Sequence, residues 1–166
     1  SVESQNLLQA RTASTSKRIL REVCSRLKLL TEIQLGLLQG GSRSDQQQLL
    51  WLAVCKRYKV LYDFSSEVVR NKYLHLDLAV TGTDFDNFLE AKSIWHAEID
   101  NLAASTRVKL RQVAFRMLRE ADIVSKENVI QPTILSAEMV QAIRSDSVTH
   151  FTIFPVSETD VRGALG

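Results

Sequence analysis

The chain has 166 residues, of which 45% are hydrophobic, and its formal net charge is +2. That hydrophobic content is enough to build one folded core and excludes a disordered chain, while the small net charge by itself identifies no partner. The longest apolar run, "LLWLAVC" at Leu49–Cys55, is far too short to span a bilayer, so we expect no membrane association.

The N-terminal half is predicted to be helical. Both prolines, Pro132 and Pro155, come late in the chain, and their absence upstream favours long helices. In chain order, we expect a short helix at Glu3–Gln9, a turn at Ala10–Ala13, a helix capped by Ser14 or Thr15 that runs to about Leu38, a stop at Gly40-Gly41, a buried central helix from about Asp45 through Phe64, and its continuation or restart over Glu67–Leu78.

The C-terminal half begins with a break at "VTGTDFD", where Thr83 and Asp86 have the spacing of a capping box. After it we expect a helix to about Trp95, a turn or short helix at His96–Leu102, a helix from Ser105 to near Asp122, a loop or small extended arm at "SKENVIQP", a helix from Ser136 to about Arg144, and an extended "THFTIFP". The predicted fold is therefore all-α, a compact single domain over residues 1–166 with little or no strand. Two helix-turn-helix-like units are expected at about 3–30 and 84–122.

Charge is sorted along the sequence. Residues 11–28 contain six basic residues and one acid, residues 101–119 contain five basic residues and no acid, and residues 77–100 contain six acids and one lysine. The two basic segments also align at an offset of 90 residues (110 − 20), which pairs Leu20, Arg21, Val23 and Arg26 with Leu110, Arg111, Val113 and Arg116. Any amphipathic basic helix repeats Leu and Arg, so this alignment is compatible with a structural repeat or with chance.

Each basic segment is predicted to form a helix with one apolar side and one cationic side. At about 100° per residue, the apolar side of the first comprises Leu20, Val23, Leu27 and Leu30, and Lys17 and Arg21 lie nearly opposite. A helix anchored by its apolar side leaves its cations and N-terminal amides free for phosphate, as in the second helix of a helix-turn-helix. The residues expected to contact duplex DNA are Ser14, Thr15, Ser16, Lys17, Arg18, Arg21, Lys28, Ser105, Thr106, Arg107, Lys109 and Arg111.

Other interpretations of the basic helices stay open. A basic helix face is most often simply solvated. The helices could also serve a protein–protein adaptor by docking on acidic surfaces of partners, and a compact helical protein with a basic end could bind RNA. Contact through several phosphates must give an affinity that falls steeply with salt, which separates nucleic-acid binding from a solvated face.

The sequence offers little catalytic chemistry. His96 and Glu98 form an H-x-E pair, but no paired cysteines follow to complete a zinc site. Cys24 and Cys55 are expected to be buried free thiols, which fits a reducing compartment and a cytoplasmic protein. We therefore expect no enzyme, no cofactor, no metal and no small-molecule substrate.

Three stretches cover most of the chain: "NLLQARTASTSKRILREVCSRL", "LLWLAVCKRYKVLYDFSSEVVRNKYL" and "TDFDNFLEAKSIWHAEIDNLAASTRVKLRQVAFRMLREADIV". They resemble the BrxA component of the bacterial BREX (bacteriophage exclusion) defence system, whose members usually carry a further segment before "NLLQ". The resemblance implies a small soluble protein that acts with a DNA methyltransferase and other BREX subunits, and it implies no catalytic residue. It does not specify which residues contact DNA.

Overall fold

The computed structural model describes the backbone of residues 2–164 and the side chains of residues 12–164. The all-α prediction is confirmed, because regular structure in the described range is helical apart from isolated β-bridges. The helices are α1 (Val2–Leu27), α2 (Glu32–Gly40), α3 (Arg43–Arg57), α4 (Lys59–Phe64), the π-helical η1 (Ser65–Val69), α5 (Arg70–Leu74), α6 (Gly82–Ser93), α7 (Ala97–Asp100), α8 (Ala104–Glu120), α9 (Ala137–Arg144), the 3₁₀-helical η2 (Val148–Ile153) and α10 (Glu158–Ala164).

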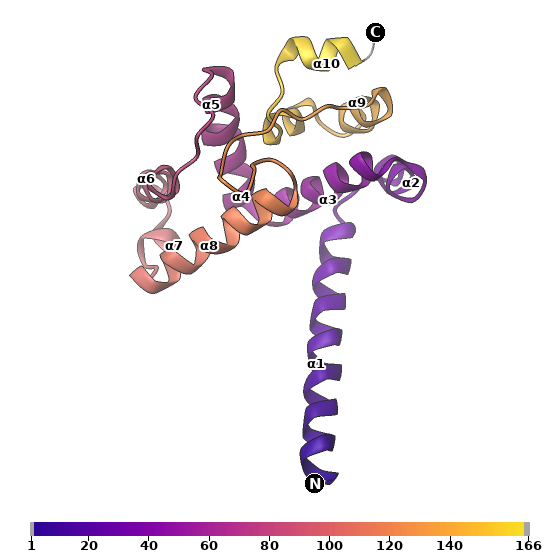
Figure 1. The fold of residues 1–166 in the computed structure, drawn as a ribbon, viewed down its shortest axis with the longest axis vertical. Coiled ribbons are helices and arrows are strands. Elements are labelled where there is room, and N and C mark those ends of the chain that lie inside the picture. The colour runs from indigo at the N-terminus through magenta and orange to yellow at the C-terminus, as the bar shows by residue number, and fades with distance from the viewer. Residues whose placement is uncertain (1, 165–166) are drawn as a thin grey trace.

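Helix α1 differs from its prediction at both ends. It is continuous through Ala10–Ala13, so the predicted turn is absent and Glu3–Gln9 belongs to the same helix, in keeping with a stretch that contains neither glycine nor proline. It also ends at Leu27, because Thr31 and Gln34 form a reciprocal capping box that starts α2 as a separate helix. None of the described helices is long and apolar enough to cross a membrane. In Figure 1, α1 projects from the body as a rod, and its C-terminal end meets α3.

Helix α3 is central and buried, as predicted, but it ends at Arg57, and the predicted continuation to Phe64 is a separate helix, α4. Ser42 and Asp45 form the capping box of α3, which moves its start to Arg43. Leu49 and Leu52 are fully buried, and the Trp51 indole N–H donates to the Ile153 carbonyl at 3.1 Å. That hydrogen bond ties the C-terminal segment to the centre of the fold.

An aromatic cluster joins three helices that are far apart in the sequence. Phe64 at the end of α4 lies 4.9 Å and 5.3 Å, between ring centroids, from Phe85 and Phe88 of α6. Its ring centroid lies 6.3 Å from that of Phe115 of α8. Edge-to-face and tilted aromatic pairs of this kind stabilise a core beyond their buried area, so α6 and α8 are held firmly on α4.

The unit predicted at about 84–122 contains the expected helices α6, α7 and α8 in order. Its predicted cap is wrong by two residues, since the box is formed by Thr81 and Asp84 rather than by Thr83 and Asp86. The shift leaves Asp86 on the side of α6 that meets α8, where its carboxylate pairs with Arg111.

The C-terminal third is partly as predicted. Isolated bridges Ala79–Val129 and Val124–Ile130 form the small extended arm, and Ser136 caps α9 by accepting from the Met139 N–H. The segment "THFTIFP" is a 3₁₀ helix over most of its length and not extended, and α10 was not predicted.

Candidate nucleic-acid interface

Helix α1 presents its basic residues to solvent. Lys17, Arg18 and Arg21 are exposed, and Lys28 is exposed just beyond the last helical residue. Among the residues whose side chains are described, none of these cations has a carboxylate within ion-pair distance. Arg26 differs, because it pairs with Glu22 at 3.7 Å and lies over the Tyr58 ring. The remaining cations are available to an anionic ligand.

The hydroxyl residues of α1 do not form the predicted N-terminal phosphate site. Ser14, Thr15 and Ser16 are exposed, but they lie well inside a helix that begins at Val2. They therefore do not cap its N-terminus, and the helix has no free backbone amides at this point. Any role in DNA contact would have to come from the side chains alone.

The apolar side of α1 is only partly anchored. Leu30 is buried and Leu27 is half-buried, but Leu20 is 64% exposed and Val23 is 40% exposed. Ile19, on the same side, is 57% exposed. The prediction that this side packs on a scaffold therefore holds only at the C-terminal end of the helix.

In α8, the two predicted arginines are engaged inside the protein. Arg107 donates to Glu90 Oε2 and to the Ile99 carbonyl, both at 3.1 Å. Arg111 is hydrogen-bonded and ion-paired to the Asp86 carboxylate. Their side chains are 24% and 32% exposed. The expectation that these guanidiniums project freely is therefore wrong.

Arg107 and Arg111 are engaged because of which side of α8 packs against the rest of the protein. Leu110 and Val113 align with the apolar Leu20 and Val23 of α1, yet they are only partly buried. The buried residues of α8 are Ala114, Phe115 and Leu118. At about 100° per residue, Arg107 and Arg111 share that buried side and lie along α6.

The other predicted residues of α8 are accessible. Ser105, Thr106 and Lys109 are exposed in its first turns, although Ala103 occupies the N-cap position and makes no side-chain cap bond. By helical geometry Lys109 lies on the opposite side from Arg107. The predicted α8 cations therefore do not form one face.

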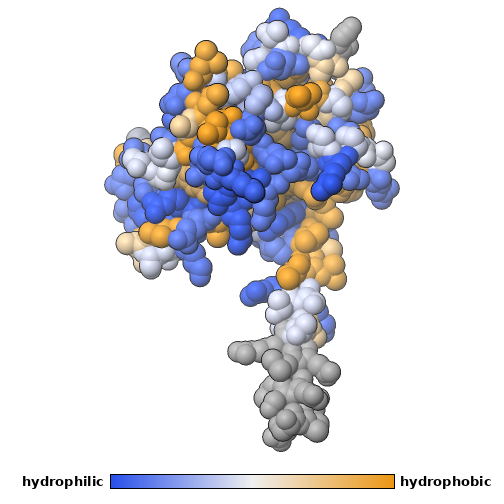
Figure 2. All heavy atoms as spheres, in the orientation of Figure 1, coloured by the Kyte–Doolittle hydropathy of each residue, from blue (hydrophilic) through white to orange (hydrophobic). Residues whose placement is uncertain are grey.

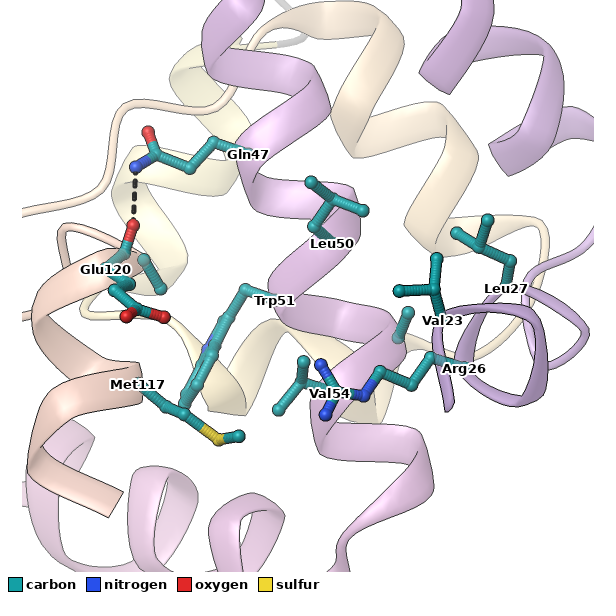
Figure 3. Close-up of a pocket in the computed structure, with 11 residues that line it drawn as sticks. Val23, Arg26, Leu27, Gln47, Leu50, Trp51, Val54, Met117 and Glu120 are labelled. Carbon is teal, nitrogen blue, oxygen red and sulfur yellow. Dashed lines mark hydrogen bonds between the residues drawn. The ribbon is translucent and has the colours of Figure 1, made fainter. Parts of the chain in front are cut away.

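A groove that the sequence did not predict lies where α1, α3 and α8 meet. Its volume is about 380 Å³. Figure 3 shows Val23 and Leu27 of α1 on one side, Leu50 on α3, and Trp51 and Met117 on the other side. The Gln47 side-chain amide closes one end by donating to the Glu120 carbonyl at 2.9 Å. The groove is thus apolar at its centre and polar at its ends.

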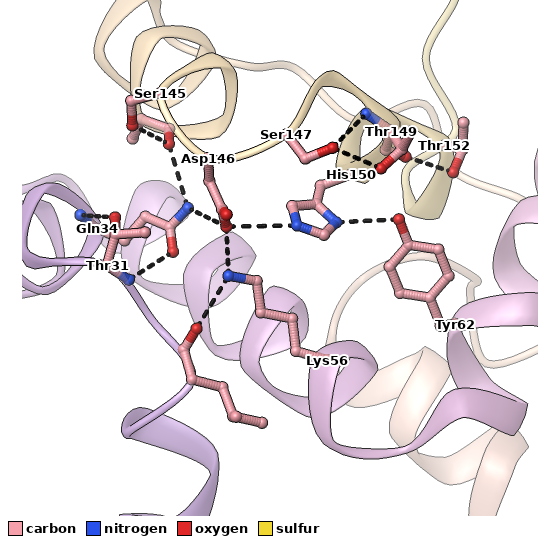
Figure 4. A network of polar contacts seen from close by, with 12 residues as sticks. Thr31, Gln34, Lys56, Tyr62, Ser145, Asp146, Ser147, Thr149, His150 and Thr152 are labelled. Atoms are coloured by element: carbon pink, nitrogen blue, oxygen red, sulfur yellow. Dashed lines mark hydrogen bonds and ion pairs between the residues drawn. The ribbon is translucent and has the colours of Figure 1, made fainter.

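A polar network on another side of α3 joins several helices (Figure 4). The Asp146 carboxylate accepts from Lys56 Nζ and, at 3.2 Å, from Gln34 Nε2. It also lies 3.3 Å from His150 Nε2, and His150 Nδ1 lies 3.0 Å from the Tyr62 hydroxyl. Tyr62 is 88 residues from His150 along the chain, so the sequence alone does not identify this network.

Burial and hydrogen bonding shift the pKa values of His150 and Asp146 in this network. Burial lowers the pKa of His150, and the Asp146 carboxylate only partly opposes that effect. Burial alone would raise the pKa of Asp146, but hydrogen bonds from Lys56 and Gln34 more than offset it, so its pKa lies below the usual aspartate value. The network therefore favours a charged Asp146 beside a neutral His150.

Comparison with known proteins places this architecture in a family. The BrxA family model matches residues 1–147. The chain belongs to the BrxA family. It is 26% identical over 145 residues to the BREX protein BrxA of Bacillus cereus (strain H3081.97), covering 86% of this chain and 72% of that relative. It is 27% identical over 123 residues to the BREX protein BrxA of Escherichia coli O9:H4 (strain HS), covering 74% of this chain and 58% of that relative.

The described part of this BrxA-family chain shows no group of three or more His, Cys, Asp or Glu side chains placed to hold a metal ion. His96 and Glu98 form a surface pair, 3.3 Å apart. Both cysteines are free, but only Cys55 is buried; Cys24 is exposed because nothing covers that part of α1.

Proposed function

We propose that this BrxA-family protein is a non-enzymatic subunit of a BREX phage-defence system that binds duplex DNA through the basic side of α1. The observation that carries the proposal is the row of exposed cations on a projecting helix: Lys17, Arg18, Arg21 and Lys28. The names of its relatives, BREX protein BrxA, support the assignment to that system.

The physical basis is phosphate neutralisation. Cations that are not paired within the protein can displace counterions from DNA without first breaking an ion pair, and each phosphate contact adds to the salt dependence of binding. Arg107 and Arg111 would have to leave Glu90 and Asp86 first. We therefore assign the main contact to α1, with Lys109 of α8 as a minor contributor, and we expect weak sequence preference.

A salt-titrated gel shift with duplex DNA, single-stranded DNA and RNA tests the proposal. We expect duplex affinity to fall steeply with salt, and Arg21→Glu to weaken binding to all duplex sequences alike and to reduce the log–log salt slope by about one. Arg144→Glu is the matched control, because Arg144 is an exposed arginine on α9 with the same change of charge. A flat salt response, or an equal loss of duplex affinity in the two variants, would refute the α1 assignment. Stronger binding to structured RNA would indicate RNA as the ligand in place of duplex DNA.

A second candidate function is a protein–protein adaptor for other BREX subunits, including a DNA methyltransferase. The exposed apolar side of α1 favours it, because monomeric soluble proteins rarely leave such a surface uncovered. Co-purification with the methyltransferase in high salt and nuclease would support this function. Co-purification that is lost on nuclease treatment would favour DNA binding instead.

A further inference from the structure

An uncovered apolar surface runs from α1 into the body of the protein. On α1 it comprises Ile19, Leu20 and Val23, which are 57%, 64% and 40% exposed. It continues into the groove beside α3 and α8, where Leu50 is 48% exposed at the rim. We call this surface the apolar stripe. Figure 2 shows hydrophobic residues gathered where the rod joins the body.

The shape of the apolar stripe fits a single helix. The groove is a concave corner between α1 and α3, with Trp51 and Met117 at its inner side. A flat bilayer surface cannot enter such a corner while also lying along α1. An amphipathic helix can, because its apolar face is narrow and apolar residues spaced three or four apart insert into a groove.

The charge around the apolar stripe indicates which charge a helix docked there should carry. At about 100° per residue, Lys17 lies beside Leu20 at one edge of the stripe. Arg18, Arg26 and the Glu22 carboxylate lie together with Ile19 and Val23 at the other edge. The α1 residues that border the stripe therefore carry an excess of 3 − 1 = 2 positive charges. A second copy of α1 would bring the same excess, and the two helices would repel each other. A helix whose apolar face is flanked by Asp and Glu complements this charge.

We propose that the apolar stripe is a docking site for an amphipathic helix of another protein, apolar on one face and acidic on its flanks. The site lies on the side of α1 nearly opposite Arg21, so it does not depend on the DNA contact. It rests on the second candidate function, the adaptor, and names the chemistry of the partner. The docked helix covers the exposed residues of α1 and fills the groove with an apolar side chain.

The test uses two synthetic helical peptides of about 18 residues, roughly 27 Å long. Both carry the same leucine face, and their flanking positions are Glu in one and Lys in the other. Fluorescence anisotropy of the labelled peptides should show saturable binding of the Glu-flanked peptide, about tenfold tighter than the Lys-flanked one. Leu20→Glu and Leu50→Glu should each weaken it by about tenfold.

Ile134→Glu is the matched control, because Ile134 is 83% exposed and lies outside the apolar stripe. It should leave peptide affinity unchanged, and circular dichroism should report intact helices in all variants, since the substituted side chains are already exposed. Equal affinity for both peptides, or no effect of Leu20→Glu, overturns the proposal.

Two other possible occupants of the apolar stripe, a second copy of the chain and a membrane surface, are tested alongside the peptides. A concentration-dependent dimer in sedimentation that Leu20→Glu abolishes, without peptide binding, assigns the stripe to a second copy and overturns the proposal. Co-sedimentation with anionic phosphatidylserine vesicles, again without peptide binding, assigns the apolar stripe to a membrane surface and also overturns the proposal. Failure of DNA binding leaves all these readouts intact, so the two proposals fail separately.

Discussion

The Asp146 carboxylate holds three helical segments together at a single residue. It accepts from Lys56 of α3 and Gln34 of α2, and it faces His150 of η2. Asp146→Ala would leave the Lys56 ammonium, only 13% exposed as a side chain, without its carboxylate. The free energy of unfolding should fall by about 1–3 kcal/mol in urea denaturation. Asp100→Ala, an exposed aspartate on α7, should change it by less than about 0.5 kcal/mol.

The same network predicts a pH dependence of stability. The pKa of His150 is lower in the folded protein than its ordinary value of about 6.5, so the unfolded chain binds this proton more readily. Its contribution to stability is complete above the unfolded pKa and is lost as pH falls through the folded pKa. Asp146, whose pKa is also lowered, contributes a further loss at more acidic pH.

Urea denaturation between about pH 7.5 and about pH 5.5 should therefore show stability that declines as pH falls. His150→Gln removes the titrating group and should flatten that decline. His75→Gln is the control, because His75 is exposed on the α5–α6 connection. A decline that persists in His150→Gln would show that another group is responsible.

At the level of elements, two ion pairs, Arg107–Glu90 and Arg111–Asp86, link α8 to α6. The Asp86 side chain is 48% exposed, so the pair with Arg111 is well screened by water. Arg111→Gln should therefore lower the free energy of unfolding by less than about 1 kcal/mol. Duplex affinity should stay within about twofold of wild type in the gel shift, in contrast to Arg21→Glu. An equal loss of affinity in both variants would mean that Arg111 leaves Asp86 to reach DNA.

Helices α3, α8 and α9 were predictable because their signals are local. Hydroxyl caps and apolar runs mark α3 and α9, and the polar turn before α8 separates it from α7. The orientation of Arg107 and Arg111 was not predictable, because α8 has two partly apolar sides. The side that is buried depends on Phe64 and Phe85, which belong to other helices. Sequence periodicity on α8 alone carries no information about that choice.

The candidate binding surfaces were likewise only partly predictable from the sequence. The cationic side of α1 follows from residue spacing, and the exposure of Lys17 and Arg21 agrees with it. The groove brings together α1, α3 and α8, and its members Val23, Trp51 and Met117 carry no common motif. Only tertiary packing identifies them as neighbours.

The whole molecule consists of a packed body and a projecting rod (Figure 1). Residues 12–22 of α1 lie on the exposed part of the rod, where nearly every side chain faces solvent. Helices held only by their own backbone hydrogen bonds open easily, whereas helices buried in a core open only with global unfolding. The two parts of the molecule should therefore differ widely in local stability.

Hydrogen–deuterium exchange measures this difference directly. Amides of residues 12–22 should exchange orders of magnitude faster than those of α3, whose residues Leu49 and Leu52 are fully buried. Saturating duplex DNA, or the Glu-flanked peptide, should slow exchange in this part of α1 and leave α3 unchanged, because a ligand that binds only the helical form shifts its opening equilibrium. Arg21→Glu should remove the protection given by DNA and keep that given by the peptide, whereas Leu20→Glu should do the reverse. Loss of both protections in either variant would mean that the two sides of α1 do not act as separate binding surfaces.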